Sequence, residues 1–279
     1  MSGRSSSKAD KADRVALVLG AIKGIGKGIA LDLARRGFKV ALTYHDWPEA
    51  LPALQANCAA LGDQCGLFDV DLRDCEAIPH LISAVLSRFG RLDVLVNNIE
   101  RGGWPVVHGP YIPDQWDLEM EITLRAKRWV FDAALPHLKA SGNGCVVNLS
   151  SIAGVVGRSG PASLIFNDGY AAANRAVSLL TETWARVAAP EVRVNEIMLG
   201  LVATRHGQET RGWGLLDDEQ KDALLDHTLL GRIGTIEDVV KAVRFVIDEA
   251  PFMSGSVIRL DGGYVLGGDK VGPMPPGVV

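Results

Sequence analysis

Short apolar runs alternate with longer amphipathic segments along most of this 279-residue chain. The apolar runs are predicted strands, at 15–19, 39–44, 66–70, 92–96, 145–149, 192–197 and 256–260. The segments between them are predicted helices, at 25–36, 48–61, 75–89, 114–139, 169–188 and 236–248. Strands separated by such helices form βαβ units, whose strands run parallel and whose helices cover the sheet. The alternation therefore predicts an α/β fold with one doubly wound parallel sheet, a three-layer αβα sandwich.

The same pattern predicts how the chain is divided. No repeat and no linker-like stretch interrupts residues 14–264, so we expect a single domain there. Residues 1–13 are polar and rich in Ser, Lys and Asp, which predicts a disordered tail. Residues 265–279 are rich in Gly and Pro, and we expect a tail that is disordered or crosses a neighbouring subunit.

Composition excludes several classes of partner. A net charge of -4 provides no basic field for nucleic acid or anionic lipid. The four cysteines form no C-x-x-C pair and the six histidines no H-x-x-x-H pair, so we predict no metal site and reduced thiols. No apolar run approaches the roughly 20 residues that span a bilayer, and no signal-peptide core is evident. We expect a cytoplasmic protein that binds a small molecule.

Three glycines follow the first predicted strand with the spacing G-x-x-x-G-x-G: Gly20, Gly24 and Gly26. Glycine allows a tight turn and close approach of a pyrophosphate, and the following helix start offers unpaired N–H groups. Alone, such a loop indicates only a strand-to-helix turn. At the first βα junction of an alternating chain, it predicts a dinucleotide site.

The end of the second predicted strand bears on which dinucleotide binds. An acidic residue there pairs with the ribose diol of NAD and repels the 2′-phosphate of NADP. Tyr44 and His45 occupy this place, and Asp46 comes one or two residues late. Lys23, just before Gly24, offers a phosphate charge-assisted contacts, although a solvated turn residue is the alternative. These residues favour NADP(H) over NAD(H).

Further motifs follow in order along the chain. They are Asp69, Asn97-Asn98-Ile99-Glu100, Ser150-Ser151, Tyr170-Ala171-Ala172-Ala173-Asn174, Arg193-Val194-Asn195, Leu199-Gly200 and Asp261-Gly262-Gly263. With the glycine loop, this series resembles the short-chain dehydrogenase/reductase family over nearly the whole chain, although Leu19 stands where that family usually has Thr. The resemblance implies a Rossmann-like NAD(P)-binding domain.

The resemblance also implies the cofactor-binding residues. Asp69 matches an acidic residue that binds adenine in relatives. The complete implied set is Gly20, Lys23, Gly24, Ile25, Gly26, Tyr44, His45, Asp69, Val70, Asn97, Tyr170, Asn174, Gly200, Val202 and Thr204.

In relatives, a Tyr exchanges a proton with the substrate oxygen, a Ser orients the substrate carbonyl, and a Lys one helical turn after the Tyr lowers its pKa. The resemblance assigns these places to Tyr170, Ser151 and Asn174. Ser151 and Tyr170 are 19 residues apart, a longer separation than relatives show. The intervening Gly/Ser/Pro/Asn-rich segment predicts a loop insertion that still lets the two side chains meet.

Four residues depart from the family pattern. Asn174 replaces the Lys, and a neutral amide supplies no charge to lower a phenol pKa. Thr123 replaces the Asn that supports that Lys, Glu100 replaces the Gly of N-N-A-G, and Leu199 replaces a Pro. The last two substitutions are equally compatible with drift at positions where the backbone matters more than the side chain.

Three hypotheses follow for function. The first is an NADP(H)-dependent carbonyl reductase or alcohol dehydrogenase with Tyr170 as acid/base and an alkaline pH optimum. The second is a nucleotide-binding pseudoenzyme with a regulatory or scaffold role, and the third is a cleft that takes a different ligand.

Two regions outside the motifs also carry expectations. In relatives the segment at about 200–232 closes over the substrate as a lid, and Trp104, His108 and Tyr111 lie in a loop where they could shape a pocket or merely pack. The resemblance further implies a homotetramer or homodimer, formed by pairing the helices at 114–139 and 169–188.

Overall fold

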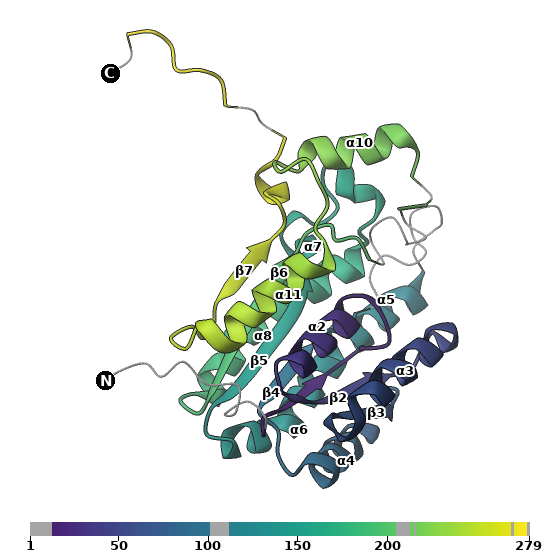
Figure 1. Cartoon of the computed structure of the whole chain (residues 1–279). Helices are drawn as coiled ribbons and strands as arrows, with labels where there is room; N and C mark the ends of the chain where they lie inside the picture. The colour runs from purple at the N-terminus through teal and green to yellow at the C-terminus, as the bar shows by residue number, and fades with distance from the viewer. Residues whose placement is uncertain (1–12, 101–111, 205–212, 215, 269–270, 278–279) are drawn as a thin grey trace.

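The computed structural model describes residues 13–100, 112–204, 213–214, 216–268 and 271–277. Its sheet has seven parallel strands in the order β3-β2-β1-β4-β5-β6-β7 (Figure 1). The strands are β1 (Val15–Val18), β2 (Lys39–Tyr44), β3 (Cys65–Asp69), β4 (Val94–Asn97), β5 (Gly144–Ser151), β6 (Val192–Leu199) and β7 (Val257–Leu260). The order reverses between β1 and β4, which creates the crevice where α/β sheets bind ligands.

Helices cover both faces of this sheet (Figure 1). Their bounds are α2 (Gly24–Arg35), α3 (Leu51–Leu61), α4 (Ala77–Phe89), α5 (Pro113–Glu119), α6 (Lys127–Ala140), α7 (Ala153–Val156), α8 (Asp168–Ala188), α10 (Asp218–His227) and α11 (Ile236–Arg244). Helices α2, α3 and α11 share one buried core, whereas α4, α6 and α8 share the other. The predicted three-layer αβα sandwich is confirmed.

Strand β1 is apolar throughout because both of its faces are buried, whereas β7 is partly exposed and β6 carries Arg193, Asn195 and Glu196. In β1, Ala16 and Val18 belong to one core, and Val15 and Leu17 to the other. A strand with period-2 side chains buried on both sides must read as a continuous apolar run. This explains why the strands could be recognised without alternation of polar residues.

The predicted helix at 114–139 is three segments in the structure. A π-helical turn, Met120–Ala126, separates α5 from α6. Such turns use wider i→i+5 hydrogen bonds and recur near functional sites. At this turn the side chains of Thr123 and Lys127 are fully buried toward the sheet. The burial of Lys127 was not predicted, because a lysine side chain usually stays in contact with water.

The cysteine prediction is wrong for one pair. Cys58 at the end of α3 and Cys65 at the start of β3 form a disulfide with a Cα–Cα distance of 5.3 Å. The short 3₁₀ turn Gly62–Gln64 brings the two residues together by reversing the chain between helix and strand. Cys75 and Cys145 are free thiols.

Within the described ranges, no helix is both long and apolar enough to cross a membrane. The predicted limits of the domain and of the two tails stay predictions. Residues 1–12 of the first tail lie outside the described part of the chain.

Candidate functional site

The glycine loop at the carboxyl end of β1 adopts the conformation that its sequence predicts. Gly20 and Gly24 have φ of 65° and 58°, the left-handed region that glycine favours. The Gly20 N–H donates to Thr43 Oγ1 at 3.0 Å, and Asn98 Nδ2 donates to the Gly20 carbonyl at 3.0 Å. Both neighbouring strands therefore hold the loop in place.

Gly26 is fixed by space rather than by backbone angle. A Cβ there would lie 2.3 Å from the Gly20 carbonyl oxygen and 2.5 Å from Asn98 Nδ2. Helix α2 begins beside it without an acidic residue in its first turn and without a side-chain cap, so its positive end is available. Thr204 lies over the same turn, 3.8 Å from where a Gly24 Cβ would be. This arrangement fits a dinucleotide pyrophosphate.

Lys23 precedes α2 and lies against the loop that follows β2. Its Nζ is 3.1 Å from the ring centroid of Trp47, a cation–π contact. Trp47 has φ of 68°, which is uncommon for a residue other than glycine. The contact holds a positive charge at the β2 end, where the 2′-phosphate of NADP is expected.

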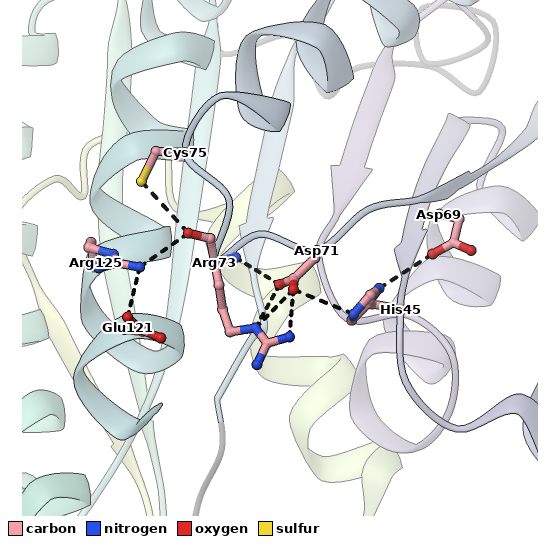
Figure 2. Close-up of polar contacts among 7 residues, drawn as sticks. All are labelled: His45, Asp69, Asp71, Arg73, Cys75, Glu121 and Arg125. Carbon is pink, nitrogen blue, oxygen red and sulfur yellow. Dashed lines mark hydrogen bonds and ion pairs between the residues drawn. The ribbon is translucent and has the colours of Figure 1, made fainter. Parts of the chain in front are cut away.

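The ends of β2 and β3 carry a charged cluster that Figure 2 shows in detail. His45 lies between two carboxylates, with nitrogen–oxygen distances of 3.6 Å to both Asp69 and Asp71. Arg73 donates to both oxygens of Asp71, and this bond lowers the pKa of that carboxyl. The Val70 N–H donates to the Tyr44 carbonyl, which joins the two strand ends. The structure thus brings His45 and Asp69 together, and their role at the adenosine end of a cofactor stays a prediction.

Ser151 and Tyr170 meet despite their separation in sequence. Ser151 ends β5, and Tyr170 lies in the first turn of α8, where its N–H donates to the capping Asn167 at 2.7 Å. The insertion between them forms α7 and the 3₁₀ turn Pro161–Leu164 and leaves both elements intact. Ser151 lies close enough to the Tyr170 phenol to act on it, and this contact lowers the pKa of the phenol.

Glu100 provides the second partner of the Tyr170 phenol, which donates to Glu100 Oε2 at 2.9 Å. Burial raises the pKa of Tyr170 well above 10, and the negative charges of Glu100 and Glu119 raise it further. The contact with Ser151 acts in the opposite direction and is outweighed. The phenol is therefore protonated at neutral pH, the reverse of the shift that a neighbouring Lys gives in relatives.

Asn174, in the Lys position, connects β5 to α8. Its Oδ1 accepts from the Ser151 N–H at 2.9 Å, and its Nδ2 donates to the Tyr170 carbonyl at 3.0 Å. The residue has no exposed surface. The amide thus braces the two predicted catalytic residues, and contact with a cofactor ribose would require the side chain to turn outward.

Sequence reasoning missed two buried charges beneath this site. Lys127 is fully buried, its Nζ donates to the Leu149 carbonyl at 2.6 Å, and desolvation lowers its pKa to about 8 against the opposing pull of Glu100 and Glu196. Glu196 accepts hydrogen bonds from Ser150 and Ser178, and its own burial raises its pKa. The available signals were a carboxylate inside the apolar strand VRVNEIML and a lysine one turn after Thr123.

Other predicted cofactor residues have structural contacts. Asn97 is fully buried and donates to Asn148 Oδ1 at 2.7 Å. A Cβ on Gly200 would lie 2.6 Å from the Cα of Asp261, so this glycine allows two backbones to pack. Val202 is buried and bridges to Gly234. Their predicted roles in binding a cofactor stay predictions.

Several predicted features fall outside the described residues. They are the loop residues Trp104, His108 and Tyr111 and part of the predicted lid, at 205–212 and 215. The described remainder of that segment includes α10.

Comparison with known proteins agrees with this geometry. The sequence profile of the family described as enoyl-(acyl carrier protein) reductase matches residues 20–265. The chain is 31% identical over 260 residues to the 3-oxoacyl-[acyl-carrier-protein] reductase FabG of Staphylococcus aureus (strain Mu50), covering 92% of this chain and 100% of that protein. It is 30% identical over 257 residues to the FabG of Thermotoga maritima, covering 91% and 98%.

Solved structures give the same result. A putative short-chain alcohol dehydrogenase from Sinorhizobium meliloti 1021 superposes with a TM-score of 0.79 at 28% identity, covering 91% of this chain and 97% of that one. A short-chain dehydrogenase/reductase from Brucella melitensis gives 0.76 at 26% identity, covering 90% and 96%. The chain belongs to the short-chain dehydrogenase/reductase family, and is an oxidoreductase of that class.

Proposed function

We propose that this protein is an NADP(H)-dependent oxidoreductase of the carbonyl reductase or alcohol dehydrogenase type, with Tyr170 as acid/base. The observation that supports this most is that Asn174 holds Ser151 and Tyr170 together at the carboxyl edge of the sheet, where Ser151 acts on the Tyr170 phenol. This edge also carries the glycine loop, so a substrate oxygen held by the two hydroxyls would lie in the same crevice as a bound dinucleotide.

The cofactor would be held by the chain's own backbone and by a few side chains. The start of α2 and Thr204 would take the pyrophosphate, and Lys23 the 2′-phosphate, whose charge favours NADP(H) over NAD(H). When bound, the nicotinamide supplies or accepts the hydride.

Tyr170 and Ser151 would handle the substrate oxygen. In the reducing direction, Ser151 orients the carbonyl, and the protonated phenol of Tyr170 donates its proton to the oxygen as negative charge develops there. The raised pKa of Tyr170 keeps this donor protonated across the neutral range. In the oxidising direction the same phenol must first lose a proton, which its environment opposes.

The substrate class follows from the relatives' names alone. The FabG relatives are 3-oxoacyl-[acyl-carrier-protein] reductases. A substrate panel should therefore begin with 3-oxoacyl thioesters and continue with simple ketones and secondary alcohols.

The test is cofactor-dependent turnover of this panel by the natural chain and by Tyr170→Phe, with NADPH binding measured in parallel. The proposal predicts turnover that Tyr170→Phe abolishes while NADPH still binds. NADPH binding without turnover of any panel member would favour the pseudoenzyme hypothesis, and failure to bind NADPH would favour a different ligand.

We also propose a cytoplasmic homodimer or homotetramer assembled through α6 and α8. Trp129 on α6 is 45% exposed, and Leu179 and Val187 on α8 are 66% and 53% exposed, which is a high exposure for large apolar side chains. Light scattering coupled to size exclusion would test this, and a monomer at micromolar concentration would contradict it.

A further inference from the structure

Glu100 occupies a place that the family pattern gives to glycine, and its carboxylate contacts the atom from which a proton must leave. Its Oε2 accepts the phenolic hydrogen bond of Tyr170 at 2.9 Å. The amide of Asn174, by contrast, is engaged with backbone groups. Glu100 is therefore the titratable group in direct contact with the phenol among the described residues.

We propose that Glu100 is a second catalytic residue, which accepts the phenolic proton of Tyr170 during alcohol oxidation. This inference rests on the proposed oxidoreductase function. The hydroxyl proton of the substrate passes to the Tyr170 oxygen as the phenolic proton passes to Glu100 Oε2. The alcohol carbon becomes a carbonyl as a hydride leaves it. A bound NADP⁺ would take up that hydride, so that oxidation of the substrate is balanced by reduction of the dinucleotide.

Burial supports this assignment. Tyr170 is only 1% exposed, so its phenol cannot exchange its proton directly with bulk water. Glu100 is partly exposed, and it connects the buried phenol to the surface of the crevice. A proton accepted by Glu100 can leave to solvent without passing through the core.

Charge supports it as well. Releasing a phenolic proton to water is unfavourable here, because burial and two neighbouring carboxylates oppose the phenolate. Transfer within an existing hydrogen bond avoids a free phenolate, because the substrate proton replaces the one that leaves. Glu100 thereby gives the phenolic proton a route that needs no lysine beside the phenol.

Lys127 acts in this scheme as a positioning residue. It is fully buried below the site, and both Glu100 and Glu196 act on it electrostatically. The Lys127 ammonium group and the Glu100 carboxylate attract one another, which favours the charged form of Lys127. Relatives have a positive charge beside the Tyr. In this chain the positive charge of Lys127 lies at the start of α6 and acts through Glu100.

The experiment compares Glu100→Gln with the matched control Glu119→Gln. The glutamine at position 100 keeps the shape but cannot take up a proton. Glu119 also raises the pKa of Tyr170 through its charge, and its Oε1 accepts a hydrogen bond from Asn167, whereas the phenol donates to Glu100. Glu100→Asp serves as the conservative variant, and thermal melts verify that each variant folds.

Two readouts are required. The first is the ultraviolet titration of the Tyr170 phenol, assigned by difference from Tyr170→Phe, which needs no turnover. Glu100→Gln should lower the Tyr170 pKa by more than Glu119→Gln does. The second is the pH profile of alcohol oxidation with NADP⁺, where Glu100→Gln should lower kcat by about 100-fold at neutral pH with little change in KM.

The shape of the pH profile separates a relay from a structural effect. Without the acceptor, oxidation should depend on ionisation of the phenol itself, so activity of Glu100→Gln should recover as pH rises toward the Tyr170 pKa. Glu100→Asp should retain part of the activity at neutral pH. Glu119→Gln should keep the natural profile within a few-fold.

The outcomes distinguish this inference from the proposed function. A natural chain that turns over no alcohol or ketone contradicts the proposed function, and the titration still decides whether Glu100 controls the phenol. An unchanged Tyr170 titration in Glu100→Gln overturns the relay whatever the activity. Full oxidation by Glu100→Gln with an unchanged pH profile overturns it as well.

Discussion

The two halves of the crevice differ in how closely they follow the family pattern. Around β1 and α2, the glycine spacing, the helix start and Thr204 form a nucleotide site whose geometry depends mainly on backbone. Around β5 and α8, the lysine is replaced by Asn174, while Glu100, Lys127 and Glu196 add charges. A site formed mainly by backbone tolerates little change in sequence. A site formed by charged side chains can keep its chemistry when those charges move to neighbouring elements.

This redistribution moves the positive charge away from Tyr170 and adds negative charge. Asn174 removes a positive charge beside Tyr170, whereas Lys127 places one beneath the same site, within reach of the charges of Glu100 and Glu196. The comparison therefore predicts that burying Lys127 costs the catalytic half stability and that the nucleotide half depends on glycine for its binding.

The largest expected effect comes from Lys127→Met, which removes a buried charge whose desolvation outweighs the attraction of Glu100 and Glu196. We expect the free energy of unfolding at pH 7 to rise by about 3 kcal/mol, because folding no longer transfers an ammonium group from water to the interior. Denaturant unfolding measures this change. A fall of more than about 1 kcal/mol would show instead that the cation is needed beside buried Glu196.

Lys127 should also give stability a distinct pH dependence. Its folded pKa of about 8 lies below the ordinary lysine value of 10.5, so the unfolded state binds more protons between these two pH values. The contribution of Lys127 to the free energy of unfolding should rise by about 3 kcal/mol as pH increases through this window. The free energy of unfolding of the natural chain minus that of Lys127→Met isolates the effect, and a value that falls with pH would contradict it.

In the nucleotide half, Gly26→Ala should weaken NADPH binding by roughly 100-fold, about 2.7 kcal/mol. The added Cβ would lie 2.3 Å from a backbone oxygen of Gly20, so the loop must shift away from the pyrophosphate position. Isothermal titration calorimetry measures the change. Gly272→Ala, whose Cβ meets nothing within 4 Å, is the control, and equal affinities of the two variants would contradict the steric account.

Lys23→Ala should have the smallest effect, about a 10-fold loss of NADPH affinity, or about 1.4 kcal/mol, with NADH affinity unchanged. The reason is that only NADPH carries the 2′-phosphate that the cation would contact. Lys27→Ala, one turn later on α2, controls for the loss of a surface charge. Equal losses of NADPH and NADH affinity would show that Lys23 stabilises the turn and does not select the cofactor.

The fold was predictable because its signals are local. The strands match their predicted ranges within one or two residues, as do α2, α4 and α8. Strands buried on both faces, such as β1, read as continuous apolar runs. The π turn before Lys127 was missed, because the apolar spacing of 114–139 is compatible with an uninterrupted helix. The Cys58–Cys65 disulfide was missed because it depends on how one short turn reverses the chain.

The candidate site was predictable only in part. Ser151 and Tyr170 could be placed by motif, and the structure brings them together. The hydrogen bond between Glu100 and Tyr170 joins residues 70 positions apart. The charge of Lys127 acts on Glu100 and Glu196, which lie in other parts of the chain. Spacing along the chain carries no signal for such contacts, which arise only when the elements pack.

The most direct test of the account is turnover of the substrate panel with NADPH by the natural chain and by Tyr170→Phe, with dinucleotide affinity measured for both. The account predicts measurable turnover by the natural chain, a loss of at least about 100-fold in Tyr170→Phe, and NADPH binding by both. Turnover that survives in Tyr170→Phe, or no turnover by a natural chain that binds NADPH, would contradict it.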